Sequence, residues 1–225
     1  TLGLARHFAW ERRTTGTVLL VAGLGNTSFL GFAAVEALLG ADNLPPALAY
    51  DQLGTFLGLA IFGTIVASRY GAAETGWRPV VRRLLTFPPF FALLAVVPLR
   101  TWPLPDGVTD GLAEIGRFLP PVAMFALGLR FRLRLGEHVR RSAVWCLATK
   151  MVLLPMTVLA VALVAGTTDE LAWQTSILEA GMPPMVTAAV VATQAGLDEE
   201  LSAFVVGAGL VVAAVTLPLL RLAMG

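Results

Sequence analysis

A long apolar segment near the C-terminal end of the chain is interrupted by the stretch Glu179-Ala180-Gly181-Met182-Pro183-Pro184. Glycine is free of side-chain restraint, and proline has no backbone N–H to donate to a helix. The apolar residues on both sides are suited to helices. The stretch therefore predicts a helix that is broken midway, within residues 175–196.

The composition of the whole chain places this broken helix in a membrane. Of 225 residues, 56% are hydrophobic and only 14% are charged, and the mean hydropathy is +0.77. Soluble domains carry roughly 25% charged residues. The composition disfavours a water-soluble enzyme, a disordered chain and a coiled coil, and it predicts an all-α polytopic membrane protein.

The charged and metal-binding residue types exclude several partners. A net charge of +1 gives no reason to expect a nucleic-acid partner. The single Cys146 cannot form an intrachain disulfide, and His7 and His138 are too far apart in sequence to suggest a metal site. No nucleophile, histidine and acid pattern of an intramembrane enzyme is present. We therefore expect no catalytic residues, no metal and no resident cofactor.

A membrane-spanning helix needs about 20 mainly apolar residues. Seven segments fit, although the third is short: 14–39, 49–68, 84–97, 111–129, 142–165, 175–195 and 201–220. Twelve of the sixteen Lys and Arg residues lie in alternate loops. The positive-inside rule places those loops in the cytoplasm. We thus predict a multi-pass protein of the plasma or inner membrane, with the Thr1 end cytoplasmic and the Gly225 end outside.

The first segment is interrupted in the same way as the sixth. Its centre reads Gly25-Asn26-Thr27-Ser28, and it aligns without gaps on the later break, so that Gly25 falls on Gly181 and Gly40 on Gly196. The two segments cross the membrane in opposite directions. Similar broken helices in opposite orientation indicate an inverted repeat. The alternative is that glycine and proline merely kink two packed helices.

The breaks predict a binding site at the middle of the membrane. Freed backbone groups cost several kcal/mol each there unless they are satisfied. Asn26 is a favourable N-cap, and Pro183 or Pro184 suits a first helical turn. The two second half-helices would direct their positive ends to the midplane, which favours an anion. The first half-helices would offer carbonyl oxygens suited to a cation.

Two ionisable residues fall inside the predicted spans near the second break. Glu179 precedes Gly181 by two residues, so we expect it to coordinate an ion or proton, or to form a structural pair. Lys150 is the single lysine of the chain and could pair with Glu179 or extend to the membrane surface. Glu36 is expected near the outer interface.

These motifs resemble the auxin efflux carrier family, which includes plant auxin exporters and bacterial permeases for malate and other organic acids. Further matching stretches are Leu127-Gly128-Leu129 after Pro120-Pro121, and Gly196-Leu197-Asp198-Glu199-Glu200. The resemblance implies ten helices in two inverted repeats of five, with crossing broken helices at the fourth and ninth positions. That fold is similar to the bile acid–sodium symporters. The seven segments would be helices four to ten, with the first three helices absent.

The resemblance also implies a division of the chain. Residues 1–13 would be a cytoplasmic loop after a missing helix, and 14–71 the end of the first repeat. Residues 72–83 would be a cytoplasmic linker, and 84–225 the complete second repeat, with its broken helix at 175–196.

Individual residues acquire roles through the same resemblance. Asn26 matches the crossover Asn that looks like a substrate-binding group, and Pro183 matches the crossover Pro. The stretch Glu179-Ala180-Gly181-Met182 is similar to one that binds sodium in bile acid symporters. Two positions depart from the family pattern: Phe87-Pro88 stands where many members have Asn-Pro, and Pro183-Pro184 replaces Gln-Asn, which argues against sodium coordination.

We therefore predict a secondary-active or facilitative transporter of a small organic anion, an auxin- or malate-like carboxylate, that works by alternating access. The predicted substrate-binding residues are Gly25, Asn26, Thr27, Ser28, Gly181, Met182, Pro183 and Pro184. Glu179 and Lys150 are predicted to couple an ion or proton, or to pair. Coupling to Na⁺ or H⁺ stays open, as does a homodimer. The alternatives are a non-transporting receptor or subunit and a sodium-coupled organic-acid symporter.

Overall fold

The computed structural model describes residues 10–71, 95, 105–129 and 136–224. Within these residues all regular structure is helical, and no strand occurs. Three helical runs there are long and apolar enough to cross a membrane: Ala41–Tyr70, Val139–Ala165 and Glu199–Ala223. The protein is an all-α polytopic membrane protein. The predicted span 84–97 and linker 72–83 lie outside the described residues, apart from Ala95.

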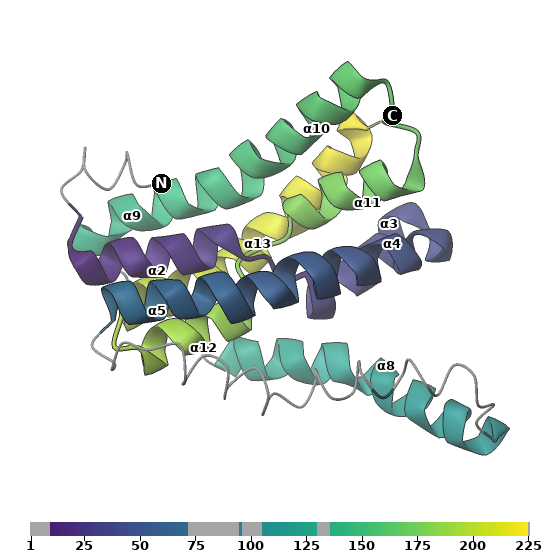
Figure 1. Cartoon of the computed structure of the whole chain (residues 1–225), viewed down its shortest axis with the longest axis horizontal. Helices are drawn as coiled ribbons and strands as arrows, with labels where there is room; N and C mark the ends of the chain where they lie inside the picture. Colours follow the sequence, from purple (N-terminus) through teal and green to yellow (C-terminus); the bar gives the residue numbers. More distant parts are fainter. Residues whose placement is uncertain (1–9, 72–94, 96–104, 130–135, 225) are drawn as a thin grey trace.

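Both predicted helix interruptions are present. Helix α2 (Arg12–Gly23) stops before residues 24–26, and the chain resumes as η1 (Thr27–Gly31) and α3 (Phe32–Leu39). Helix α11 (Leu171–Ala180) is separated from α12 (Val186–Gln194) by residues 181–185. The two interrupted helices run in opposite directions along the molecule (Figure 1).

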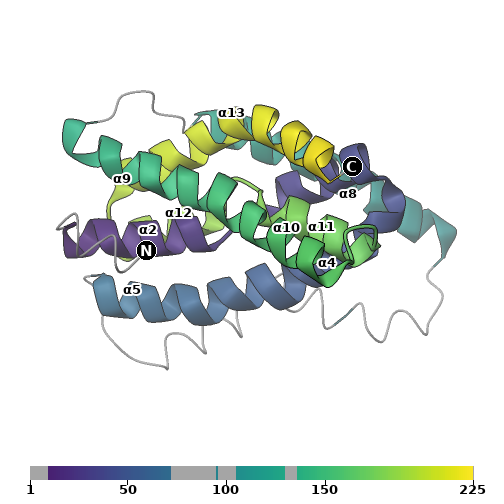
Figure 2. The same cartoon turned by 90° about the horizontal axis from the view of Figure 1, so that it is seen from above.

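The remaining helices pack against this pair. One rod is formed by η2 (Ala41–Asn43), α4 (Leu44–Ala49), η3 (Tyr50–Phe56), η4 (Leu59–Gly63) and α5 (Thr64–Tyr70). A second is formed by α9 (Glu137–Ala148), η5 (Thr149–Leu153) and α10 (Leu154–Ala165), and α13 (Glu199–Ala223) is a third. Helix α2 lies between α5 and α13 (Figure 2). Helix α8 (Asp106–Leu129) extends along one side of the molecule (Figure 1).

Apolar side chains are buried where these helices meet, and many others cover the outside. Val18 and Val21 of α2 pack with Leu201 and Val205 of α13 in one core cluster. Large apolar side chains elsewhere are exposed, such as Phe125 of α8 at 71%. An apolar outer surface is what a lipid environment requires, since lipid tails are as apolar as these side chains.

The two interrupted helices end alike and are tied to each other at their ends. Gly40 follows α3 and Gly196 follows α12, and both adopt positive φ, at 95° and 69°. The Thr17 hydroxyl accepts from the Asp198 N–H at 2.9 Å, just beyond Gly196. The Thr175 hydroxyl donates to Asn43 Oδ1 at 2.9 Å, just beyond Gly40. This correspondence is what an inverted repeat would produce, and the repeat itself stays a prediction.

Candidate functional site

The two breaks cross and bond to each other through their backbones. The Asn26 N–H donates to the Pro183 carbonyl at 2.8 Å, and the Met185 N–H donates to the Leu24 carbonyl at 2.9 Å. Between these bonds, Gly25 and Pro184 form an antiparallel bridge. The bridge satisfies backbone groups that the interrupted helices leave without partners. The structure thus brings the two predicted substrate-binding stretches together.

The predicted capping at these breaks is wrong in detail. Asn26 occupies the N-cap position of η1, but its side chain makes no capping bond. Its buried amide Nδ2 has no hydrogen-bond partner in the part of the chain that the structure describes. The two prolines do not start α12, which begins two residues later, with Met185 at the N-cap position. They stay outside the helix because the backbone bridge holds this stretch against the first break.

The hydroxyls of Thr27 and Ser28 are engaged by a carboxylate that sequence reasoning missed. They donate to Asp51 Oδ1 at 2.5 and 2.6 Å. The Gln52 amide donates to Asp51 Oδ2 at 2.7 Å. Asp51 is buried on η3. Because the two hydroxyl protons point to this carboxylate, the Asn26 amide is the nearby side-chain donor that lacks an acceptor among the described residues.

Asp51 was missed because the helix that carries it begins earlier than predicted. The apolar segment starts at residue 49, which places Asp51 at its polar edge. In the structure the helical run extends from Ala41 to Tyr70. Asp51 consequently lies ten residues inside the run, beside the first break. The available signal was Pro45-Pro46 after Asn43, which marks a helix start.

Glu179 is fully buried in the last turn of α11. Within the described ranges, neither of its carboxylate oxygens has a hydrogen-bond partner. The carboxylate lies against the backbone of η1, since a Cβ placed on Gly31 would come within 2.5 Å of Oε2 and 2.7 Å of Oε1. Asp51 and Lys150 are both within electrostatic range of it. An ionised carboxylate buried without partners is costly, and a proton or a cation removes that cost.

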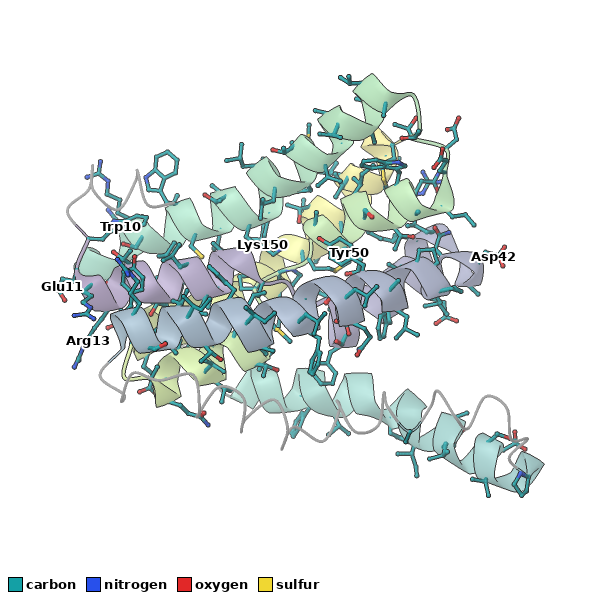
Figure 3. All side chains as sticks on the ribbon, viewed as in Figure 1. Trp10, Glu11, Arg13, Asp42, Tyr50 and Lys150 are labelled. Carbon is teal, nitrogen blue, oxygen red and sulfur yellow. The ribbon has the colours of Figure 1, made fainter. Side chains whose placement is uncertain are left out.

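Lys150 is also buried, at 3% exposure, so it does not extend to the membrane surface. Its Nζ donates to the Ala180 carbonyl at 2.8 Å, at the end of α11. Neither Glu179 carboxylate oxygen accepts from it, so the direct ion pair that the sequence suggested is not formed. The aliphatic end and ammonium rest against Gly25, where an added Cβ would lie 3.0 Å from Nζ. Figure 3 shows Lys150 and Tyr50 in the middle of the molecule, far from Asp42 at one end and Glu11 at the other.

Two further predicted site residues, Met182 and Gly181, lie against apolar side chains. The Met182 side chain is fully buried in an apolar cluster with Ile177, Leu178 and Leu217. Gly181 is approached by Leu220, whose Cδ2 would lie 2.8 Å from an added Cβ. Both residues thus contribute apolar packing at the second break, and their predicted part in substrate binding stays a prediction.

Three short π-helical segments carry five of the polar side chains near the crossing. Thr27 and Ser28 lie in η1, Asp51 and Gln52 in η3, and Lys150 in η5. A π-helical turn shifts the register of the side chains that follow it and is common at functional sites. The departure from α-helix is thus concentrated around the crossing.

Comparison with known proteins agrees with this arrangement. The family model described as "Membrane transport protein" matches residues 2–221. An uncharacterized transporter of Methanothermobacter thermautotrophicus is 27% identical over 226 residues, covering 97% of this chain and 73% of the relative. An uncharacterized transporter of Methanocaldococcus jannaschii is 26% identical over 132 residues, covering 56% of this chain and 42% of the relative. With the family model matching nearly its whole length, the chain belongs to the membrane transport protein family, which is the auxin efflux carrier-like family.

Proposed function

We propose that this membrane transporter carries a small organic anion by alternating access, with the anion bound at the crossing of the two broken helices. The observation that carries the proposal is the buried Asn26 amide, whose Nδ2 has no partner among the described residues beside the first break. A buried donor without an acceptor is costly, and a ligand carboxylate would satisfy it. The carrier would be secondary-active or facilitative.

The backbone around Asn26 adds to the attraction for an anion. Helix α12 begins at Val186, directly after the bridge that pairs the two breaks. The first-turn N–H groups of a helix have no intrahelical acceptors, and the helix dipole places partial positive charge there. The Lys150 ammonium adjoins Gly25, the residue before Asn26. An amide, a helix N-terminus and an ammonium together favour a carboxylate over a neutral solute.

Glu179 is the group we propose for coupling. Its carboxylate is buried, has no hydrogen-bond partner in the described part of the chain, and faces the backbone of η1 at Gly31. Taking up a proton or a cation there would remove its negative charge from the crossing and so favour the arrival of an anion. Release of that ion on the other side would favour departure of the anion. We place the carrier in the plasma or inner membrane, with its Thr1 end in the cytoplasm.

The experiment measures the thermal stability of the full-length protein in detergent against malate, malonate and indole-3-acetate. A ligand at a hundredfold its Kd stabilises a protein by about 2.7 kcal/mol. One acid should raise the unfolding temperature of the wild type. Replacement of Asn26 by Ala should weaken the binding of that acid about tenfold, because a hydrogen bond to a charged group contributes roughly 1.5 kcal/mol.

The matched control is Gln194→Ala, which removes an exposed amide from the far end of α12. It should respond to the acid like the wild type. Uptake of the same labelled acid into proteoliposomes then separates a carrier from a receptor. If no acid stabilises the protein, or if Asn26→Ala responds as the wild type does, the anion site is not at the crossing. Binding without uptake would favour the receptor.

A further inference from the structure

The double proline of the second break leaves one carbonyl of α11 without a backbone partner from its own helix. The carbonyls of Ile177 and Leu178 accept from the Gly181 N–H, and the Glu179 carbonyl accepts from the Met182 N–H. The next carbonyl, that of Ala180, would accept from residue 183 or 184. Both are prolines, which have no N–H to give. The sequence therefore creates an acceptor at membrane depth that needs a donor from elsewhere.

Lys150 supplies that donor with an ammonium. Its Nζ lies 2.8 Å from the Ala180 carbonyl oxygen. Helix α11 is 10 residues long, and the C-terminal end of a helix carries partial negative charge, which a cation stabilises. Gly25 leaves room for the ammonium, because a Cβ there would lie 3.0 Å from Nζ and 3.2 Å from Cε. The position thus offers a cation both a carbonyl oxygen and the negative end of a helix dipole.

The surrounding charges also favour a cation at this point. The Glu179 carboxylate, which lacks a hydrogen-bond partner among the residues described, is within electrostatic range of Lys150. Asp51 adds a second buried carboxylate within electrostatic range of Glu179. The buried Glu179 carboxylate and the C-terminal end of α11 would attract a free monovalent cation if no side chain stood there. The ammonium of Lys150 already fills that role.

We propose that the Lys150 ammonium is a tethered cation at the C-terminal end of α11, and that it takes the place of an exchangeable Na⁺ or K⁺. The side chain and the double proline act as a matched pair, one satisfying the unpaired carbonyl that the other creates. This inference rests on the proposed transport function only for its consequence: the ion that couples at Glu179 is then a proton.

The test is the thermal stability of the full-length protein without organic acid, in sodium, potassium, methylammonium or choline chloride at equal ionic strength. The wild type should unfold at the same temperature in all four salts. Lys150→Ala should unfold at a lower temperature in choline. Sodium or methylammonium should raise the unfolding temperature of Lys150→Ala by about 3 to 6 °C at a concentration tenfold above the Kd of the cation.

The matched control is Lys150→Met, which fills the space of the lysine stem without charge. It should be destabilised in every salt and should respond to neither cation. The inference is overturned if sodium specifically stabilises the wild type, or if a folded Lys150→Ala protein responds to no cation. If Lys150→Ala does not fold, the binding of labelled Na⁺ to the wild type is measured directly. The inference expects no binding, and specific binding of Na⁺ would overturn it.

The same salts separate this inference from the proposed function. A wild type that ignores sodium and also binds no carboxylate would overturn the anion site and leave the tethered cation standing. A wild type that binds a carboxylate tenfold more tightly in sodium than in choline would support the anion site and overturn the tethered cation.

Discussion

The two broken helices have the same backbone layout but satisfy their breaks with opposite charges. At the first break, the hydroxyls of Thr27 and Ser28 donate to the buried Asp51 carboxylate. At the second break, the Ala180 carbonyl accepts from the Lys150 ammonium. The two segments thus share the backbone geometry of a broken helix, while the charged side chain that bonds to each break differs in sign. An alignment of the two breaks therefore locates the crossing without revealing what each half attracts.

The largest effect is expected from removing the carboxylate of the first break. Asp51→Ala would leave the hydroxyls of Thr27 and Ser28 and the Gln52 amide without their acceptor. Buried donors left unpaired are costly, so we expect a loss of about 3 kcal/mol. Tryptophan fluorescence during heating in detergent would show this as a decrease of about 6 to 12 °C.

Asp51→Asn is the matched control, because its amide oxygen still accepts from the two hydroxyls. It should lose about 1 kcal/mol, since only the negative charge and one acceptor change. Equal losses for Ala and Asn would mean that the hydroxyl bonds contribute little and that charge alone stabilises the first break.

A smaller effect is expected from crowding the prolines of the second break. A Cβ on Gly209 of α13 would lie 2.7 Å from Cδ of Pro184 and 3.1 Å from Cβ of Pro183. Proline rings cannot rotate away, so Gly209→Val should destabilise the protein by about 2 kcal/mol, measured in the same heating experiment.

Gly116→Val is the control for this substitution, because a Cβ on Gly116 of α8 would meet no atom of the described residues within 4 Å. It should change stability by less than about 0.5 kcal/mol. A Gly209→Val protein as stable as the control would show that the second break repacks easily, and that its proline pair is less constrained than the contacts imply.

The smallest effects are expected at the ends of the two broken helices, where each helix is held by one threonine hydroxyl. Thr17→Val removes the hydroxyl paired with Asp198, and Thr175→Val removes the one paired with Asn43. Valine keeps the volume, so each should cost about 1 kcal/mol, and the double substitution should cost their sum. Unequal losses in thermal unfolding would argue that the two ends are not related as a repeat.

The sequence predicted the positions of the helices well, because apolar composition and Gly or Pro interruptions are local signals. The breaks at Gly25 and Gly181 were both found in this way, while their meeting at one place was expected from the opposite orientation of the two segments and from the family resemblance. The predicted segments 14–39, 142–165, 175–195 and 201–220 coincide with described helices within a few residues. Family membership followed from the same motifs.

The polar contacts could not be predicted, because each depends on distant parts of the chain. Asp51 is buried only because its helix starts near Ala41, ahead of the apolar residues. Lys150 donates to the Ala180 carbonyl and not to the Glu179 carboxylate, at a carbonyl whose usual backbone donors are replaced by the two prolines after α11. Met182 enters an apolar cluster, although its neighbours in sequence lie at the crossing. Examining each segment of the sequence by itself does not reveal these contacts between distant residues.

The backbone bridge between the breaks also has a consequence for exchange of amide hydrogens with solvent. Asn26 and Met185 donate the two N–H groups that join one broken helix to the other. Neither amide belongs to an ordinary helical turn, and each can exchange only when the crossing opens. Once each uptake rate is divided by the intrinsic exchange rate of that amide, the two should therefore give one common free energy of opening. That free energy would report how often the two broken helices separate at the crossing.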